Sequence, residues 1–424
     1  MKKITYKDLQ LDIEQKLSNS IKKGLNKALN GVNYENKLTK NEDKHFFELL
    51  KHAVEIKNHY AVTSITKRIS KNLNLKKIDL KLFLYQDAIF NVNCFPRKEK
   101  NGNTELQIFV SQHFFNNLNE DEQVGIIGHE IAHFLFDHFV FPAHDIINFP
   151  FDIGNIGDLK SNLIYYSKVS EISADIIGLV SNDFNYKAYS TALIKHTTGL
   201  NDSANSMFSI TPLIDIVLKQ YEDYAKNIFF NDLHSTHPLM PVRVKIINEI
   251  VKCNCIRHFG QEVSDKDYIK YKNQFNELIN SVIKTVYPEI FPDNSEINEV
   301  LIPMSVAVML ADNKIDEKEL LLIKSMIKKS HRDFKELFDL FKANNDKSNF
   351  ESIKNRLIAS SIKLAKKKSF DKNLIIPIIR KLIIVAASDG NIETSELLAI
   401  YSFAKEFDIT KQDIVLLIKT QYKV

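Results

Sequence analysis

Residues that interrupt regular structure are scarce in this chain, which contains only 11 glycines and 10 prolines among 424 residues. Glycine and proline are the least favourable residues in helix interiors, whereas the abundant Lys, Glu and Leu favour helices. The composition therefore predicts a mostly helical protein. A chain of this length can bury a full-sized core, and we expect it to hold two or more domains.

Cysteine is also scarce, with three in the chain. Three cysteines are too few for a disulfide framework, so we expect free thiols in a reducing compartment. A strong excess of one charge is missing as well, because the formal net charge is only +4. That balance gives no reason to expect nucleic-acid binding.

Long apolar runs are absent. Residues 1–8 lack the apolar core of a signal peptide. The longest strongly apolar stretch in the C-terminal half, residues 301–311, is too short for a membrane-crossing helix, which needs about 20 residues. We therefore expect a soluble cytoplasmic protein with no transmembrane segment.

A small sheet is expected between the first helices and the middle of the chain. Apolar residues alternate along residues 78–85, and residues 106–111 form a second strand candidate. The polar residues 98–103 would connect them through a loop or hairpin. Residues 139–170 show no clear period and are expected to form a long loop with short helical pieces.

The chain does contain a short metal-binding pattern, H-E-x-x-H at residues 129–133. Asn119 is a good helix N-cap, and Glu122 three residues later completes a capping-box pattern. Pro142 is expected to end this helix. Positions four apart on a helix lie on one face, so the two histidines of the motif would project together.

Two imidazoles at this spacing can hold one Zn²⁺. His129 and His133 would supply two ligands, and Glu130 between them would stand beside the metal-bound water. This is the chemistry of a metalloprotease. A catalytic zinc site takes three protein ligands and keeps one position for water, so a third ligand must come from elsewhere.

Two residues are candidates for that third ligand. His138 follows His133 by five residues, an offset that turns it away from the metal face of a continuing helix, so it also reads as a polar residue at a helix end. Glu171 is the better candidate, because it shares the face of an apolar helix with Asp175. Asp175 would then accept a hydrogen bond from a metal-bound histidine.

The motifs, taken in order, resemble those of the HtpX-type and CAAX-prenyl-endopeptidase zinc proteases, which are gluzincins. The similar segments are Asn93-Cys94-Phe95, residues 128–133 with His138 after them, residues 171–175, and Thr236-His237-Pro238 with Arg243 six residues after the histidine. The resemblance covers roughly residues 50 to 255. Membrane members of the family carry transmembrane helices around the catalytic core, and we expect none in this chain.

The resemblance implies a metal site and a base. His129, His133 and Glu171 would bind one catalytic zinc ion. Glu130 would be the general base that activates the zinc-bound water, and later the proton donor.

The resemblance also implies supporting roles around the metal. His237 would hydrogen-bond the oxyanion, and Arg243 would pair with Asp175 or help to hold the site together. Spacing alone leaves His237 equally readable as a loop residue and Arg243 as a surface cation. Three residues near the substrate-binding edge would contact substrate: Asn93, Cys94 and Phe95.

The C-terminal residues 297–424 read as amphipathic helix with an internal repeat. Residues 312–319 and 389–396 both resemble the D-G-x-I-x-x-x-E signature of TerB-like (tellurite-resistance-type) helical domains. The acidic residues read either as helix caps, as in Asp316 with Glu319, or as metal ligands, which only the resemblance supports. The resemblance implies protein interaction or regulation.

The sequence thus predicts an α+β, predominantly helical protein in four parts. They are an N-terminal helical segment (1–50), a zinc metalloprotease domain (51–255), a helical linker (256–296) and an all-α TerB-like domain (297–424). We expect a zinc-dependent endopeptidase that acts on protein or peptide substrates and is regulated through its C-terminal domain, with a regulatory protein partner. The alternative is a non-catalytic metal-binding scaffold protein acting through the TerB-like repeats. The intact Glu130 argues against that alternative, since a structural zinc site needs no base.

Overall fold

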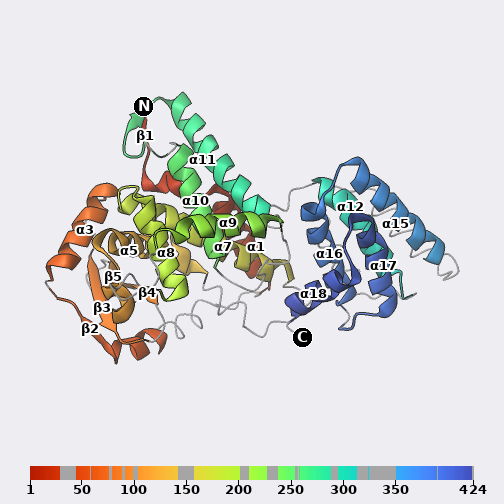
Figure 1. Ribbon diagram of the computed structural model, residues 1–424, viewed down its shortest axis with the longest axis horizontal. Helices are drawn as coiled ribbons and strands as arrows, with labels where there is room; N and C mark the ends of the chain where they lie inside the picture. The colour runs from red at the N-terminus through yellow and green to blue at the C-terminus, as the bar shows by residue number, and fades with distance from the viewer. Residues whose placement is uncertain are drawn as a thin grey trace. The chain divides into compact units, whose positions relative to one another are not determined.

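The protein forms two compact units, which are described separately below (Figure 1). Contacts between Cα atoms assign Met1–Tyr224 and Ser235–Ile283 to the first unit, and Ala225–His234 and Lys284–Val424 to the second. The computed structural model describes residues 1–28, 44–57, 59–75, 79–87, 91–98, 104–141, 157–200, 210–226, 237–253, 256, 258–287, 295–312, 323, 350–388 and 390–422.

The first unit consists of helices around a small sheet. Its helices are α1 (Asp12–Ala28), α3 (Tyr60–Asn72), α4 (Gln112–Asn116), α5 (Glu120–Leu135), α7 (Gly157–Ser181), α8 (Tyr186–Thr198), α9 (Leu213–Lys226), α10 (Met240–Cys253) and α11 (Asp265–Val286), with short 3₁₀ turns η1 (Tyr6–Leu9) and η2 (His138–Val140). A separate antiparallel pair joins β1 (Lys2–Lys3) to β6 (Glu262–Val263).

The main sheet has four strands in the order β2-β3-β5-β4. The central strands β3 (Leu80–Tyr85) and β5 (Thr104–Ser111) run parallel, whereas β2 (Ala53–Glu55) and β4 (Val92–Lys98) are antiparallel to their neighbours. The two predicted strands are confirmed as β3 and β5. The strand β4, which the sequence patterns did not predict, lies at an edge of the sheet.

Helix α5 lies at the centre of the first unit. It packs against α7, α8 and α3 and against strands β4 and β5. The predicted start of α5 is confirmed, because the Asn119 side chain accepts a hydrogen bond from the Glu122 N–H (3.0 Å) and Glu122 Oε2 accepts one from the Asn119 N–H (2.8 Å). Such a cap is worth about 1 kcal/mol.

The predicted end of α5 is wrong. The helix stops at Leu135, before Pro142, and Asp137 adopts a left-handed conformation with φ of +59°. Aspartate tolerates this region better than most residues, so the chain turns sharply here and enters η2. The expected loop over residues 139–170 is also shorter than predicted, since α7 begins at Gly157.

A glycine allows α5 and α7 to approach each other closely. A Cβ atom added at Gly128 would lie 2.3 Å from Ser181 Oγ and 3.5 Å from the Gly178 Cα. No real side chain fits in that space. The residue just before the H-E-x-x-H motif therefore brings the motif helix onto the helix that carries Glu171.

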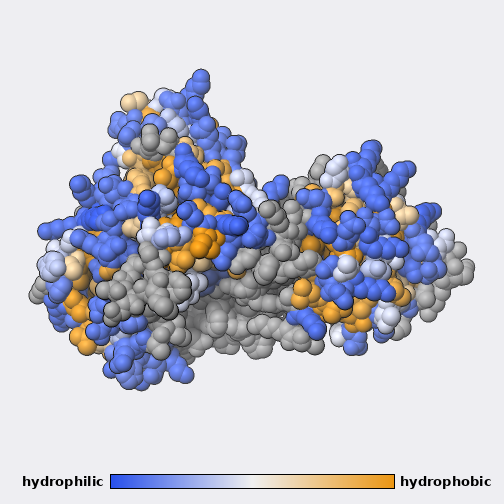
Figure 2. Space-filling model, viewed as in Figure 1, coloured by the Kyte–Doolittle hydropathy of each residue, from blue (hydrophilic) through white to orange (hydrophobic). Residues whose placement is uncertain are grey.

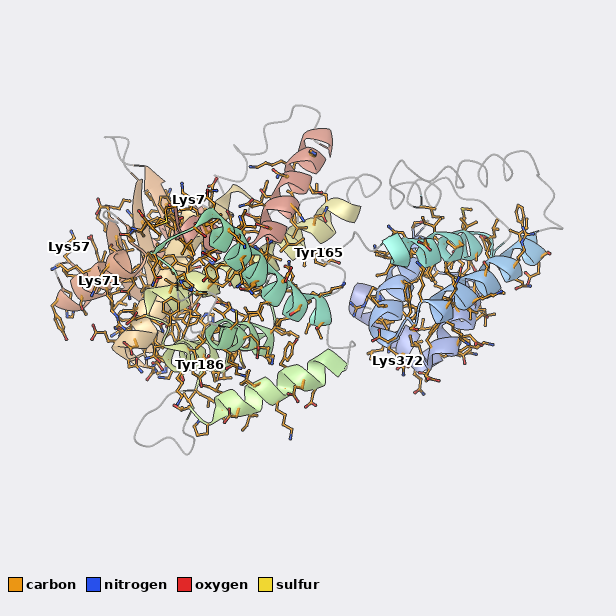
Figure 3. The ribbon with its side chains drawn as sticks, turned by 90° about the horizontal axis from the view of Figure 1, so that it is seen from above. Lys7, Lys57, Lys71, Tyr165, Tyr186 and Lys372 are labelled. Carbon is orange, nitrogen blue, oxygen red and sulfur yellow. The ribbon has the colours of Figure 1, made fainter. Side chains whose placement is uncertain are left out.

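The described part of the second unit is all helical. Its described helices are α12 (Ser295–Met309), α15 (Phe350–Lys367), α16 (Lys372–Ala386), α17 (Thr394–Ala404), the 3₁₀ turn η7 (Lys405–Phe407) and α18 (Lys411–Tyr422). They enclose an apolar core, and in each unit side chains fill the space between neighbouring helices (Figure 3). With the small sheet of the first unit, this confirms the predicted α+β, predominantly helical class.

In the second repeat, the structure shows a helix cap. The Glu393 N–H donates to Glu396 Oε2 (2.7 Å) at the start of α17, and Gly390 has φ of +108°, a region that favours glycine. The corresponding acids of the first repeat, Asp316 and Glu319, and also Asp389, lie outside the described residues. The predicted domain boundaries stay predictions.

Most of the described residues on the face drawn in Figure 2 are hydrophilic, and apolar residues form separate groups among them. None of the helices that the structure describes has the length and apolar character that crossing a bilayer requires. Cys94 is free and buried, whereas Cys253 is disulfide-bonded, so the expectation of free thiols is wrong for Cys253.

Candidate metal centre and active site

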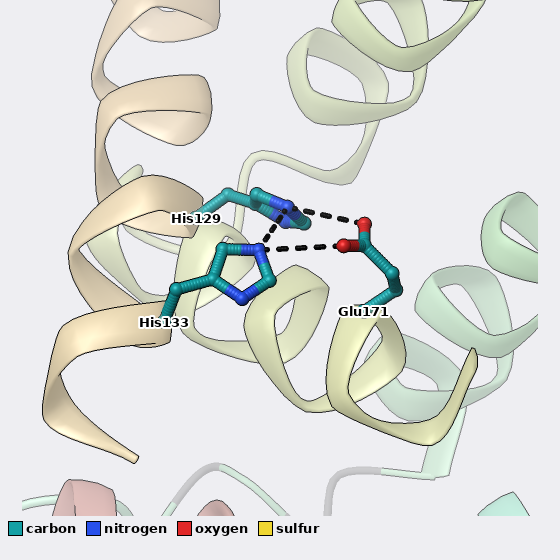
Figure 4. A group of neighbouring side chains, drawn as sticks. All are labelled: His129, His133 and Glu171. Atoms are coloured by element: carbon teal, nitrogen blue, oxygen red, sulfur yellow. Dashed lines mark hydrogen bonds and ion pairs between the residues drawn. The ribbon is translucent and has the colours of Figure 1, made fainter. Parts of the chain in front are cut away.

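Three potential metal ligands converge between α5 and α7 (Figure 4). One ligand atom each from His129, His133 and Glu171 lies within 4.8 Å of the others. The two Nε2 atoms are 3.1 Å apart, and each lies 3.4 Å from an oxygen of the Glu171 carboxylate. Ligands about 2.0–2.1 Å from a tetrahedral zinc ion are about 3.3 Å from one another. The spacing of these donors therefore fits such an ion.

The charge states of two of these groups suit a cation. Burial would raise the pKa of Glu171, but His237, His129 and His133 together hold it well below its usual range. Burial lowers the pKa of His133 well below its usual value. Glu171 is therefore ionised and His133 neutral near pH 7, which are the forms that bind metal.

His129 differs from its partner. Burial alone would lower its pKa, but hydrogen bonds and charges from Asp175 and Glu171 raise it to about 10. Without a metal, His129 therefore carries a second proton near pH 7. A metal ion must displace that proton when it binds.

Asp175 holds the far side of His129. Its Oδ1 lies 3.0 Å from His129 Nδ1, and it accepts a bidentate pair of hydrogen bonds from Arg243, Nε to Oδ2 (2.7 Å) and Nη2 to Oδ1 (2.6 Å). Burial would raise the pKa of Asp175, but Arg243 and His129 lower it. Arg243 Nη2 also lies 3.6 Å from Glu171. The buried Arg243 guanidinium thus lies within ion-pair distance of both Asp175 and Glu171.

Tyr189 on α8 belongs to the same group, and no sequence pattern pointed to it. Its hydroxyl donates to Asp175 Oδ1 (2.8 Å) and lies 3.2 Å from His129 Nδ1. A Cβ at Gly178 would come within 2.6 Å of this hydroxyl. The glycine in α7 therefore makes room for the tyrosine.

Glu130 lines a pocket of about 340 Å³ beside the metal ligands. Burial, with a smaller contribution from the negative charge of Glu171, raises the pKa of Glu130 to about 7. A carboxyl group with such a pKa can accept and release a proton near neutral pH.

The pocket has a neutral wall on the side of β4. Asn93, Cys94 and Phe95 line it together with Leu193 and His196 of α8, among other residues. Burial raises the pKa of the Cys94 thiol well above its usual value. Burial lowers the pKa of His196 to about 4. Both side chains are therefore uncharged at neutral pH.

The structure places His237 at the rim of the pocket. Its side chain is 61% exposed, and its Nε2 lies 3.6 Å from Glu171 Oε1. It is therefore close to the metal ligands yet accessible to a molecule that enters the pocket.

His138 lies behind His133 rather than beside the three donors. Its Nδ1 is 2.8 Å from His133 Nδ1, the ring nitrogen on the opposite side from the metal group. The early end of α5 explains this position, because the left-handed Asp137 turns the chain back on itself. A helix assumed to continue past Leu135 would not place His138 behind His133.

Two family models match the chain. Residues 57–251 match peptidase family M48, and residues 298–418 match tellurite resistance protein TerB. Both resemblances predicted from the motifs are thereby confirmed. The first match supports a metallopeptidase, which is a hydrolase acting on peptide bonds. No curated protein and no solved structure matches the chain.

Proposed function

We propose that this protein is a zinc-dependent endopeptidase. The observation that carries the proposal is the group of His129, His133 and Glu171, whose donor spacing fits zinc and which faces a pocket lined by Glu130. Among the described residues this metal-binding group holds three protein donors, the number found in catalytic zinc sites, which keep a position for water. Peptidase family M48 supports the same class of chemistry.

His129, His133 and Glu171 would hold the zinc ion. Bound there, zinc supplies Lewis-acid chemistry, which polarises a carbonyl and makes water more acidic. Asp175, with Arg243 and Tyr189, fixes the orientation of the His129 ring. Such contacts keep a ligand in place and make it more basic.

Glu130 acts as the proton carrier. In the forward step its carboxylate accepts a proton from the attacking water, and in the next step its carboxyl group passes that proton to the nitrogen of the leaving amine. Both transfers are favourable near neutral pH because burial raises the pKa of this group.

His237 stabilises the negative charge that develops on the peptide carbonyl oxygen. Its place at the rim, partly exposed and within 3.6 Å of Glu171, lets its Nε2–H donate to that oxygen. A well-placed donor of this kind is typically worth about 10²- to 10³-fold in rate.

An extended substrate binds along β4. This strand is an edge of the sheet, and Asn93, Cys94 and Phe95 in it line the pocket. A peptide can add to a free strand edge through backbone hydrogen bonds, with its side chains entering neighbouring pockets. The uncharged wall favours a neutral side chain next to the scissile bond.

The second unit is proposed to regulate the peptidase rather than to take part in the chemistry. The proposal rests on the match of residues 298–418 to TerB and on the helix cap at the start of α17, which gives Glu396 of the second repeat a structural role without a metal. A regulatory protein is the partner that this role calls for.

The test is hydrolysis of a mixed peptide library by purified, zinc-loaded protein, with mass spectrometry of the products. Glu130→Gln is the matched variant, because glutamine has nearly the same shape but cannot carry the proton. We expect defined cleavages by the wild-type protein and a loss of about 10²- to 10⁴-fold in the variant at equal zinc content. Equal cleavage by both would contradict the mechanism.

A further inference from the structure

A buried row of side chains connects the candidate metal ligand His133 to the N-terminal helix α1. His133 Nδ1 lies 2.8 Å from His138 Nδ1, and His138 Nε2 lies 3.0 Å from an oxygen of Glu14. Glu14 is fully buried and His138 is 8% exposed. A carboxylate far from the motif in sequence is thus two hydrogen bonds away from a metal ligand.

The hydrogen-bond partners determine where the protons lie along this row. His133 must present an unprotonated Nε2 to a metal, so its proton is on Nδ1, which donates to His138 Nδ1. His138 then carries its own proton on Nε2, which donates to the Glu14 carboxylate. With this placement the direction of donation runs from His133 through His138 to Glu14 without a conflict.

Glu14 is held by more than this one contact. Ser173 Oγ on α7 donates to Oε2 (2.5 Å), and Gln10 Nε2 donates to Oε1 (2.6 Å). The Ser173 hydroxyl is in turn oriented by the Leu11 N–H, which donates to it (3.4 Å). Three donors therefore converge on one buried carboxyl group, so both of its oxygens have hydrogen-bond partners inside the protein.

The two histidine ligands, His129 and His133, are each supported by a buried carboxyl group. His129 donates directly to Asp175, whereas His133 reaches Glu14 through the intervening His138 ring. Metal-bound histidines usually donate their second N–H to such a partner, and this contact fixes both tautomer and ring orientation.

Glu14 lies outside the segment that matches the peptidase family. Glu14 is on α1 (Asp12–Ala28), before residue 57 where the match begins. Helix α1 packs against α7, the helix that carries Glu171. The N-terminal helix therefore contacts the metal centre both through packing and through this polar row.

We propose that Glu14 is a positioning residue of the metal centre. It acts through His138, holding the neutral tautomer and the orientation with which His133 presents Nε2 to the metal. The inference rests on the proposed zinc site and adds the N-terminal helix to it. It also gives His138 a role that is neither a metal ligand nor a polar helix end.

Zinc affinity tests the proposal, measured by competition with a chromophoric chelator on the full-length protein. Loss of a contact of this kind typically weakens metal binding by about 10- to 100-fold. We expect Glu14→Gln to bind zinc about tenfold more weakly, because a neutral amide oxygen is a weaker hydrogen-bond acceptor for His138 than a carboxylate. His138→Phe, which keeps a ring but no nitrogen, should show a loss within the same range.

The double variant separates a relay from two independent effects. If Glu14 acts only through His138, the variant with both substitutions binds zinc no more weakly than His138→Phe alone. If the fold-losses in zinc affinity of the two single variants multiply in the double variant, the relay is overturned. Glu105→Gln is the matched control, since Glu105 is also a buried carboxylate but pairs with Lys81 in the sheet. Its zinc affinity should stay within about twofold of the wild type.

Outcomes for the zinc site and for the relay are distinct. Wild-type protein that binds no zinc would overturn the proposed function. Wild-type protein that binds zinc tightly, together with folded Glu14→Gln of equal affinity, would overturn only the role of Glu14.

A measurement on the zinc-loaded wild-type protein needs no substitution in the row itself. Long-range ¹⁵N–¹H spectra of the histidine rings report which nitrogen carries the proton. We expect His138 as the neutral form protonated on Nε2 and His133 protonated on Nδ1. A His138 ring protonated on Nδ1 would contradict the proposal, even if the Glu14 variants failed to fold.

Discussion

Replacing Asp175 by asparagine perturbs the group of charges on which the metal centre rests. The Asp175 carboxylate, 1% exposed, accepts two hydrogen bonds from Arg243 and one from Tyr189, and it faces His129 Nδ1 at 3.0 Å. An asparagine offers one acceptor oxygen and places an NH₂ group against one of these donors. The buried Arg243 guanidinium then has only Glu171, 3.6 Å away, as a nearby acid among the described residues.

Two effects of different size are expected from this change. Breaking a buried ion pair by removing one charge typically costs about 3–5 kcal/mol. For a unit of this size, that corresponds to a fall of about 6–20 °C in the unfolding temperature of the first unit. Because His129 loses its hydrogen-bond partner, zinc affinity should fall by about 10- to 100-fold as well.

The assay combines thermal unfolding of the metal-free protein with zinc competition. Glu249→Gln is the control, since Glu249 pairs with Lys245 at 3.0 Å on the partly exposed face of α10. A pair of that kind contributes about 0.3–0.5 kcal/mol and should leave zinc binding unchanged. If Asp175→Asn were no more destabilising than this control, the account of the buried group would be refuted.

Four further outcomes follow from the same geometry. Glu171→Ala should lose zinc on metal analysis, and full retention would require another third ligand. Gly128→Ala should destabilise the first unit by about 1–3 kcal/mol, because its Cβ would lie 2.3 Å from Ser181 Oγ; Ser181→Gly should restore part of the loss in the double variant, and additive losses would count against the close helix contact. Zinc affinity should rise about tenfold per pH unit between pH 7 and 9, because the pKa of metal-free His129 is about 10 and its proton must leave on binding; a flat profile in competition titrations would contradict this. A protein truncated near residue 290 should keep its zinc and still hydrolyse a permissive peptide while its choice of protein substrates or its latency changes, and unchanged behaviour on native substrates would make the second unit a passive appendage.

Features encoded by local spacing were predictable from the sequence. The start of α5 follows from Asn119 and Glu122, whose reciprocal hydrogen bonds are observed. The clustering of His129 and His133 follows from helix periodicity alone. Glu171 was preferred as the third ligand because it shares a helix face with Asp175, although nothing local places α7 against α5.

Features that depend on contacts between distant segments were not predictable. Glu14 read only as part of an N-terminal helical segment, and Tyr189 carries no motif. In the structure Tyr189 lies 3.2 Å from His129 Nδ1, and Glu14 reaches His133 through His138. The contact of His138 with the back of His133 was not predictable, because it depends on where α5 stops. That end is set by the left-handed conformation of Asp137, and an aspartate is a weaker helix-ending signal than Pro142.

Anomalous diffraction at the zinc edge from crystals of the zinc-loaded protein is the most direct test of the central claim. We predict one ion bound by Nε2 of His129, Nε2 of His133 and the Glu171 carboxylate, with a remaining position open to water on the side of the Glu130 pocket. An ion closed off by a fourth protein ligand, or an ion bound elsewhere with these three residues empty, would contradict the account and favour a structural metal site.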